Sequence, residues 1–331
     1  SGKLIIKNIP SGKYEIQFSY TGYAKKEMEF EFPIIDSIPI EILLKNESQE
    51  LGEVVVQTTR TNSRIEDIPI RVEVIGGEEL NEKGSMKPAN LSMLLSEATG
   101  IQPQQTSAVN GNVSIRLQGL DGKYTQILKD GFPLYSGFAQ GLSIMQIPPL
   151  DLKQVEIIKG SASSLYGSDA IGGVINLISK KPQSKPELTF LLNQTSLLAT
   201  DIHGYYAQRF KKVGISLLSS NSFQVARDVN NDGFSDLPKT RTFSFNPKLY
   251  YYFNDKTTLS FGFNANTDYR NGGDMKVLDN KADNTHKFFE ENISNRIASQ
   301  LLFEKNWDKN QTFTFKNSVS YFNRKIQIPD Y

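Results

Sequence analysis

The sequence predicts a mixed fold in three parts, namely a small β unit, a compact α/β domain and a run of long antiparallel strands. Short alternating segments occupy residues 1–46, and helical spacing interrupts strands in residues 68–182. Aromatic-rich strands of about ten residues follow this region. The chain has 331 residues, 38% apolar and 22% charged. This composition is typical of folded domains and argues against disorder.

Charge and residue usage exclude several functional classes. Lys plus Arg is 37 and Asp plus Glu is 36, which gives a net charge of +1, so we expect no nucleic-acid partner. The sequence has no cysteine, and its two histidines, His203 and His286, lie far apart. We therefore assign no catalytic centre, expect no enzyme and require no cofactor. No stretch approaches about 18 consecutive apolar residues, the length of a spanning helix.

The first part reads as a series of short strands followed by a polar linker. Strands are expected at residues 4–6, 14–18, 28–32 and 38–44, and residues 47–67 form the linker. A β-branched run within the linker has two interpretations. It is an internal edge strand, or a strand that adds to the sheet of another protein through main-chain hydrogen bonds. The run consists of Glu53, Val54, Val55, Val56, Gln57 and Thr58.

The second part, residues 68–182, alternates strands with a helix. Residues 70–75 alternate as a strand, whereas residues 90–98 have helical spacing, with Asn90 as the expected N-cap and Gly100 beyond the end. Glycine-rich turns separate the later strands. These strands are expected at residues 113–117, 125–128, 154–158 and 174–178.

The third part contains about seven strands with one apolar and one polar face. In a soluble sandwich the apolar face packs on another sheet, and in an outer-membrane barrel it meets lipid, so periodicity alone leaves both interpretations open. The apolar face is expected to carry Phe243, Phe245, Leu249, Tyr251 and Phe253, then Leu259, Phe261, Phe263 and Ala265, then Phe313, Phe315, Val319 and Tyr321.

Three segments together resemble a known family. The stretch IPPLDLKQVEIIKGSASSLYGSDAIGGVINLISKKP (147–182) closely resembles the closing signature of the plug of TonB-dependent receptors. NLSMLLSEATGIQ (90–102) resembles the plug helix, and VSIRLQGLDGKYTQILKDGFPL (113–134) resembles the paired strands before the signature. The resemblance implies a plug at residues 68–182 and, at residues 183–331, the first strands of a transmembrane β-barrel of about 22 strands. It places the protein in the outer membrane of a Gram-negative bacterium.

The first residues carry a second resemblance. NIPSGKYEIQFSYTGY (8–23) resembles the closing half of a carboxypeptidase-regulatory-like β-sandwich, a module often placed ahead of transporters in the Bacteroidetes. Residues 1–46 would then be the end of such a domain. We expect the sequence to be incomplete at both ends.

The family resemblance implies active import of a scarce nutrient. The run from Glu53 to Thr58 becomes the expected TonB box, which TonB, powered by ExbB and ExbD, binds as an added strand. Siderophore-bound iron and cobalamin are the expected substrates, with outer-membrane lipid and a surface lipoprotein as further partners. The competing hypothesis is a surface or periplasmic binding module that does not transport.

Two sets of residues are carried over from the family pattern. Arg116 and Lys159 stand where receptors have basic plug residues that face acidic residues of the barrel wall, so we expect them to act as a latch; solvated charges are the alternative. Substrate is expected to contact plug loops at residues 102–112 and 134–141. The expected contact residues are Gln104, Gln105, Tyr135 and Phe138.

A polar segment in the third part has the pattern of a calcium loop. Oxygen-bearing side chains alternate and are followed by Gly233, which matches the first half of an EF-hand, but the glutamate that would complete it is absent. The segment resembles in kind the calcium-binding extracellular loop of cobalamin receptors. A polar hairpin tip is the alternative. The expected ligands are Asp228, Asn230, Asp232 and Asp236.

Overall fold

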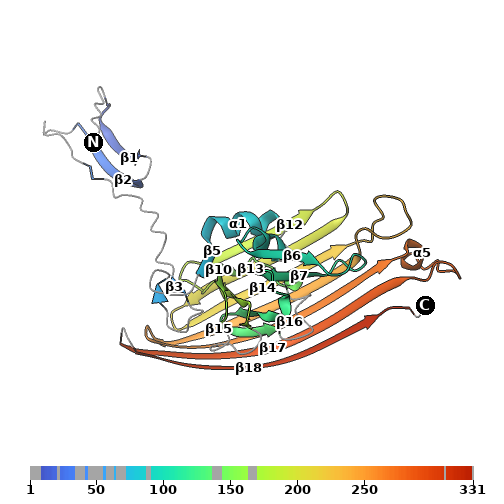
Figure 1. Cartoon of the computed structure of the whole chain (residues 1–331). Coiled ribbons are helices and arrows are strands. Elements are labelled where there is room, and N and C mark those ends of the chain that lie inside the picture. The colour runs from blue at the N-terminus through green and yellow to red at the C-terminus, as the bar shows by residue number, and fades with distance from the viewer. Residues whose placement is uncertain are drawn as a thin grey trace. The chain divides into compact units, whose positions relative to one another are not determined.

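The protein divides into two compact units, Ser1–Val55 and Val56–Tyr331 (Figure 1). The computed structural model describes residues 9–20, 23–33, 42–43, 55–56, 63–64, 72–86, 91–135, 144–162, 170–308 and 311–329. Within these residues every helix is too short or too polar to cross a membrane.

The first unit contains an antiparallel pair, β1 (Gly12–Tyr20) and β2 (Tyr23–Phe32). Aromatic side chains lie across the pair, with ring centroids 5.9 Å apart for Tyr14 and Phe32. Such cross-strand contacts stabilise two-stranded pairs. The expected strands at 14–18 and 28–32 lie within β1 and β2. Those at 4–6 and 38–44 fall outside the described residues, apart from residues 42 and 43, where no strand is assigned.

In the second unit, an α/β domain is built on a mixed five-stranded sheet. The strand order is β5-β10-β11-β8-β9, with β11 and β8 parallel and the other neighbours antiparallel. A separate antiparallel pair is formed by β6 and β7. The elements are β5 (Val72–Gly76), α1 (Gly77–Met86), α2 (Ser92–Ser96), β6 (Ile101–Gln105), β7 (Val113–Leu117), η2 (Gly122–Tyr124), β8 (Thr125–Lys129), β9 (Phe132–Tyr135), η4 (Ile144–Gln146), β10 (Leu152–Lys159) and β11 (Gly173–Ser179).

The structure corrects three expectations about this domain. The helix α2 begins after Leu91, which makes no side-chain capping bond, so Asn90 is not its N-cap. Helix α1 was not expected, because its sequence GEELNEKGSM has little apolar periodicity. Strand β6 occupies part of the segment that was expected to be a loop. Its Pro103 argued against a strand in the sequence, but the β6–β7 pair has open edges, where proline is tolerated.

The core of the α/β domain lies between α2 and the sheet. Leu94, Leu95, Ile157 and Ile175 are at most 1% exposed and belong to one apolar cluster. Gly173 begins β11 with a φ of +144°, and a Cβ there would overlap the Ile158 carbonyl oxygen and the Leu117 side chain. The close approach of three strands therefore requires glycine at this position.

Seven long strands form the last sheet, the number expected from the sequence. They pair antiparallel in chain order. Residues 211–212 and 255–256 form short turns at one end, whereas residues 195–198, 225–238 and 274–288 connect strands at the other. The strands are β12 (Glu187–Gln194), β13 (Ala199–Phe210), β14 (Val213–Gln224), β15 (Lys239–Asn254), β16 (Thr257–Gly273), β17 (Phe289–Asp308) and β18 (Gln311–Gln327), with α5 (Met275–Leu278) between β16 and β17.

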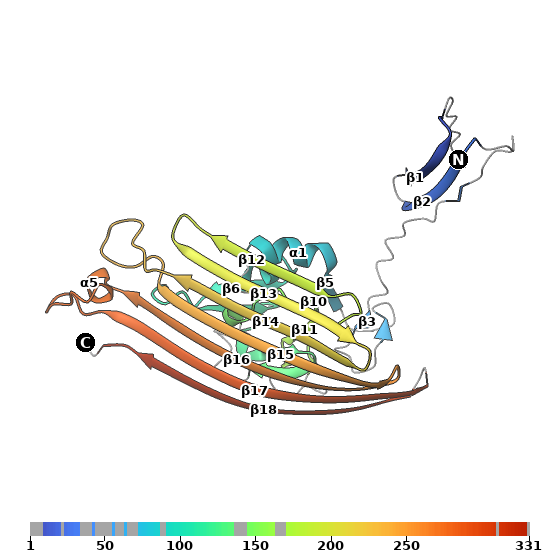
Figure 2. The same ribbon diagram turned by 180° about the vertical axis from the view of Figure 1, so that it is seen from behind.

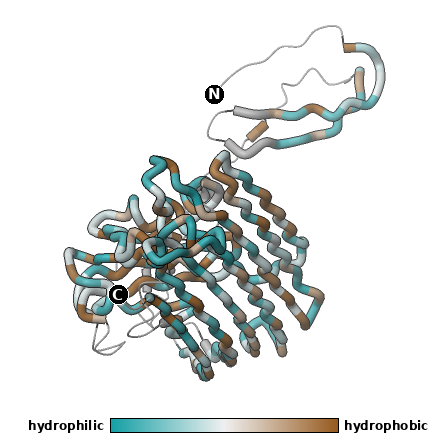
Figure 3. Tube along the Cα trace, turned by 90° about the vertical axis from the view of Figure 1, so that its right-hand side faces the viewer, coloured by the Kyte–Doolittle hydropathy of each residue, from teal (hydrophilic) through white to brown (hydrophobic). Residues whose placement is uncertain are grey.

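The two faces of this sheet differ in chemistry, as the alternating colours along the strands show (Figure 3). The outward face exposes apolar side chains such as Phe243, Leu249 and Phe261, as expected. The inward face carries mostly small or polar buried side chains, for example Ser244 and Asn266. The α/β domain lies on this concave, polar side (Figures 1 and 2).

Replacement of Gly173 by alanine should destabilise the protein by about 1–3 kcal/mol, because the added Cβ overlaps backbone and forces strands apart. The measurement is chemical unfolding of the full-length protein in detergent. Gly160→Ala is the control, since Gly160 also has positive φ but has open space at its Cβ position. Equal losses of unfolding free energy for the two variants would show that backbone strain, and not strand packing, requires glycine at position 173.

Candidate functional site

Several polar contacts hold the α/β domain against the inner face of the sheet, and the first is made by the β8–β9 turn. Asp130 and Gly131 have φ of 53° and 74°, as in a tight Asp-Gly hairpin turn. The turn presents the Asp130 carboxylate to Lys248 of β15, whose Nζ donates at 3.0 Å. Lys316 of β18 donates to the main-chain oxygen of Asp130 at 3.2 Å. Two strands of the seven-stranded sheet thus bind one turn.

The Asp130–Lys248 ion pair is largely removed from solvent, with side chains 14% and 15% exposed. Burial opposes ionisation of Asp130, but the Lys248 ammonium and the Ser179 N–H outweigh it and lower the pKa of Asp130 to about 2. The Ser179 N–H donates to the carboxylate at 2.8 Å. Asp130 is therefore ionised at neutral pH, and the contact is a charged one.

A second ion pair supports this turn from within the α/β domain. Lys129 donates to Asp151 at 2.6 Å, and the two side chains are 8% and 9% exposed. The main-chain oxygen of Asp151 also accepts the Lys180 N–H at 2.8 Å. Consecutive residues of β8 and its turn therefore point charges in two directions, Lys129 into the domain and Asp130 toward the sheet.

The second contact is formed by Gln146 at the end of η4. Its side-chain amide donates to the Ser294 hydroxyl of β17 at 2.7 Å. Its main-chain oxygen accepts from Asn266 of β16 at 3.1 Å and from the Ser244 hydroxyl of β15 at 3.4 Å. Because all four residues are buried, these neutral hydrogen bonds satisfy groups that would otherwise be costly to bury.

The third contact lies at the end of the sheet that carries the longer loops. In the loop between β6 and β7, the Ser107 hydroxyl donates to a carboxylate oxygen of Glu290 on β17 at 2.7 Å. The Asn110 side-chain amide donates to the other oxygen of Glu290, and Asn110 is fully buried. One carboxylate therefore fixes residues 106–112 to the sheet.

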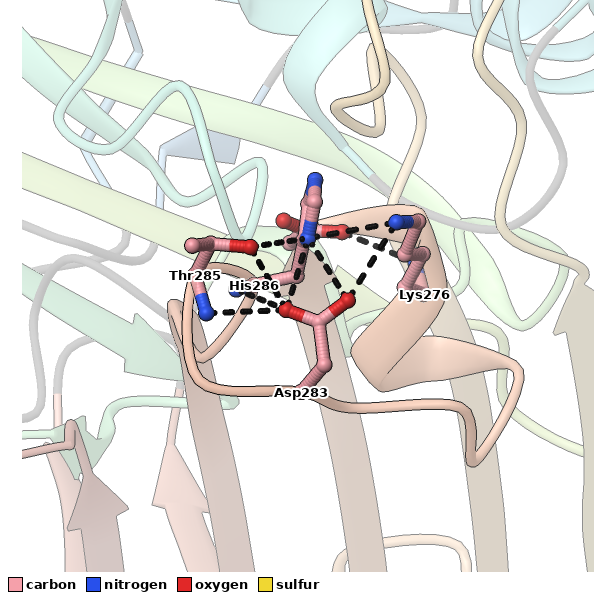
Figure 4. A network of polar contacts seen from close by, with 5 residues as sticks. Lys276, Asp283, Thr285 and His286 are labelled. Carbon is pink, nitrogen blue, oxygen red and sulfur yellow. Dashed lines mark hydrogen bonds and ion pairs between the residues drawn. The ribbon is translucent and has the colours of Figure 1, made fainter.

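The loop between β16 and β17 has its own polar network (Figure 4). The Asp283 carboxylate accepts from the Thr285 hydroxyl at 2.7 Å, lies 2.9 Å from His286 Nδ1 and forms an ion pair of 3.3 Å with Lys276. Hydrogen bonds from Thr285 and His286 lower the pKa of Asp283 well below its usual range. These contacts shape the loop that follows α5.

Of the two expected latch residues, Lys159 has its acidic partner within the α/β domain, whereas a latch at Arg116 stays a prediction. Lys159 is bound by Glu73 of β5, so its partner lies within the α/β domain. Arg116 is exposed and forms no ion pair with another described residue. The domain instead contacts the sheet through Asp130, with the acid on the domain and the base on the sheet, the reverse of the expected arrangement.

Only some of the expected substrate-contact residues and of the expected TonB box lie within the described residues. Gln104 and Gln105 are exposed on β6, in a strand and not in a loop. Tyr135 ends β9, its side chain is outside the described residues, and so is Phe138. Of the expected TonB box, Val55–Val56 form β3, which pairs with β4 (Ser63–Arg64). Glu53, Val54, Gln57 and Thr58 lie outside the described residues.

The acidic loop between β14 and β15 directs its oxygens at its own backbone. Asp228 accepts from the N–H groups of Asn231 at 2.7 Å and Gly233 at 2.8 Å, and Asp236 accepts from that of Val229 at 2.7 Å. In the described part of the chain, no group of three or more His, Cys, Asp or Glu side chains is placed to hold a metal. The geometry fits a hydrogen-bonded hairpin tip, and calcium binding stays a prediction.

Sequence reasoning missed the residues that hold the domain in place. Two of them left a signal, since Asp130-Gly131 is a strong hairpin turn and Lys248 falls on the polar face between Phe245 and Leu249. The sequence gives no signal for Gln146 and Glu290, because polar residues at strand ends and in short helices are common on any protein surface.

Residues 64–174 match the family described as TonB-dependent Receptor Plug Domain. Vitamin B12 transporter BtuB of Vibrio vulnificus is 23% identical over 317 residues, 88% of this chain and 50% of the relative. Iron-regulated outer membrane virulence protein of Vibrio cholerae is 33% identical over 129 residues, 37% of this chain and 19% of the relative. The chain thus spans half or less of the length of these relatives.

Solved receptors share the fold. The ferric yersiniabactin uptake receptor FyuA from Yersinia pestis superposes with a TM-score of 0.64 at 15% identity, covering 79% of this chain and 42% of that one. The alcaligin receptor FauA from Bordetella pertussis gives 0.62 at 15% identity, with 82% and 42% covered. The α/β domain therefore matches the plug of TonB-dependent receptors, and the seven strands share the fold of the barrel strands in these solved receptors.

Replacement of Lys248 by glutamine should destabilise the plug and barrel segment by about 3 kcal/mol, because it leaves Asp130 buried without its cation. Chemical unfolding of the full-length protein in detergent measures the loss. The double variant Asp130→Asn with Lys248→Gln should lose less free energy of unfolding than the two single variants lose together. Lys181→Gln is the control, since Lys181 is 64% exposed and 3.9 Å from Glu304. Strict additivity would contradict coupling of the pair.

The same ion pair predicts an acid transition. The pKa of Asp130 is lower in the folded protein, so its ionised form contributes stability above its ordinary pKa of 3.8. That contribution should be lost as the pH falls toward about 2. Acid titration of unfolding should show this loss in the native protein and not in Asp130→Asn. A similar loss in both proteins would assign it to other carboxylates.

Replacement of Glu290 by alanine should release residues 106–112 from the barrel wall. We expect amide hydrogen exchange in this loop to accelerate roughly ten-fold, because two hydrogen bonds to a carboxylate are lost. Mass spectrometry of exchanged peptides measures the change. Glu291→Ala, which alters the adjacent residue on the other face of β17, should leave the loop protected.

Proposed function

We propose that this protein imports a scarce nutrient across the outer membrane by TonB-dependent active transport. The observation that supports the proposal is a domain that matches the TonB-dependent receptor plug and is bound to the inner face of strands that share the fold of receptor barrels. A plug in this position blocks a lumen, so passage of a substrate requires that the plug rearrange. A largely polar plug–barrel interface supports such movement, since hydrogen bonds that are broken can be remade to water.

The coupling segment is proposed to be the run from Glu53 to Thr58. Its β-branched composition favours an extended strand, and main-chain hydrogen bonds from such a strand can complete the sheet of a partner. TonB, with ExbB and ExbD as its energy source, is the proposed partner. The position of the run ahead of the plug supports this assignment, since a pull there reaches the plug directly.

The proposed substrates are cobalamin and ferric siderophores. The relatives named as a vitamin B12 transporter and an iron-regulated protein support this class, and so do solved siderophore receptors with the same fold. Gln104, Gln105, Tyr135 and Phe138 remain the proposed plug contacts for substrate. The loop fixed by Glu290 is a further candidate, because it lies among the longer loops, the extracellular end of outer-membrane barrels.

Several finer assignments are proposed on sequence pattern alone. They are a carboxypeptidase-regulatory-like domain end at 1–46, a linker at 47–67, plug limits of 68–182, barrel strands at 183–331 and a Bacteroidetes origin. A calcium ion at Asp228, Asn230, Asp232 and Asp236 and a surface lipoprotein partner are further proposals. The alternative, a binding module without transport, predicts binding that never leads to uptake.

Replacement of Val55 by proline should abolish energy-dependent uptake while surface binding persists, because proline removes a main-chain donor from the added strand. The assay is uptake of labelled cobalamin and ferric siderophores by cells carrying the full-length gene. Val55→Thr, which keeps β-branching and the donor, is the matched control and should transport. Equal uptake by the proline and threonine variants would refute the coupling segment, and binding without uptake in the native strain would favour the binding module.

A further inference from the structure

An outward-facing groove of about 490 Å³ lies on the side of the barrel strands opposite the plug. It is lined by β15, β16 and β17 near the end of the sheet that carries the longer loops, the extracellular end of outer-membrane barrels. Lys239 and Arg241 line its β15 side, and Tyr269 stands opposite Arg241 in the strand register. Ile293 and Asn295 close the β17 side.

The groove adjoins the upper limit of the apolar band. On β15 the outward apolar residues run from Phe243 to Phe253, ten residues along the strand. At about 3.4 Å per residue and a tilt of about 40°, this run is about 26 Å high, which matches the apolar band of about 25 Å in outer-membrane barrels. Arg241 and Lys239 are the next two outward positions, about 5 and 10 Å beyond it. This is the depth of lipid headgroups.

The groove has the chemistry of a phosphate site. Arg241 and Lys239 are exposed, and neither forms an ion pair with another described residue. Arginine presents paired donors that match phosphate oxygens, and Asn295, on β17 across β16, adds neutral donors at the far side of the groove. Asp268 also borders the groove, but its carboxylate is bound on the inner face by Thr242 and Arg270.

The local charge remains positive when nearby acids are counted. Glu291 is outward-facing on β17, where it pairs in register with Asn271, the neighbour of Lys239. One carboxylate against Lys239 and Arg241 leaves a net charge of about +1 at the groove. An anion placed against these two exposed cations would be attracted by this charge.

We propose that this groove binds the phosphate of an anionic lipid in the outer leaflet, with Arg241 and Lys239 on the phosphate and an acyl chain along Phe243 and the residues below it. The continuity between the basic groove and the apolar band selects a lipid over a soluble anion, because only a lipid occupies both. The inference depends on the position of the strands in the outer membrane and not on transport, so it can fail while the transport proposal stands.

The test is native mass spectrometry of the full-length protein in detergent with phosphatidic acid and with diacylglycerol of the same acyl chains. The native protein should retain phosphatidic acid about ten-fold better, since the two lipids differ only in the phosphate. Lys239→Gln combined with Arg241→Gln should remove this preference. An excess of inorganic phosphate should not displace the lipid.

The matched control is Lys211→Gln combined with Lys212→Gln, which removes two exposed charges at the opposite end of the sheet. It should keep the preference for phosphatidic acid. Arg241→Lys alone, which keeps the charge and changes only the donor geometry, should weaken retention in part. An unchanged preference in the double groove variant, or displacement of the lipid by inorganic phosphate, would overturn the proposal.

Discussion

The difference between the two faces of the seven-stranded sheet governs how the rest of the second unit is arranged. Successive side chains of a strand point to opposite faces, so one sequence pattern builds both an apolar outer surface and a polar inner surface. The inner surface offers hydroxyls, amides and charges such as Ser294, Asn266 and Lys248. A domain that binds there must present matching polar groups, and the plug does so at Asp130, Gln146 and the loop around Asn110.

Different interactions therefore stabilise the plug fold and attach the plug to the sheet. The plug has its own apolar core, in which Leu94, Ile157 and Ile175 are buried and against which Phe322 of β18 packs. A second apolar contact with the sheet is that of Leu150 with the cluster of Tyr205, Ala207 and Leu218. Attachment depends mainly on directional bonds, which can exchange with water, whereas the apolar core would resist separation throughout.

Sequence reasoning located most of the strands because their signals are local. Alternation identified the barrel strands, and β-branched runs identified β7, β8, β10 and β11. Helix α1 and strand β6 were missed because α1 has little apolar periodicity and β6 contains Pro103. The contacts between plug and wall could not be predicted, because they depend on which turn meets which strand. Lys159 illustrates this, since its acidic partner Glu73 came from a neighbouring plug strand.

The place of β5 in the plug sheet has a mechanical consequence. β5 is an edge strand of five residues and pairs only with β10 among the strands of that sheet. A force applied to the chain ahead of residue 72 reaches β5 before the other strands of the sheet. Because an edge strand has partners on one side alone, β5 can detach while the pairing of β10, β11 and β8 is kept. The Lys159–Glu73 ion pair would then resist the first step of a pull on the plug.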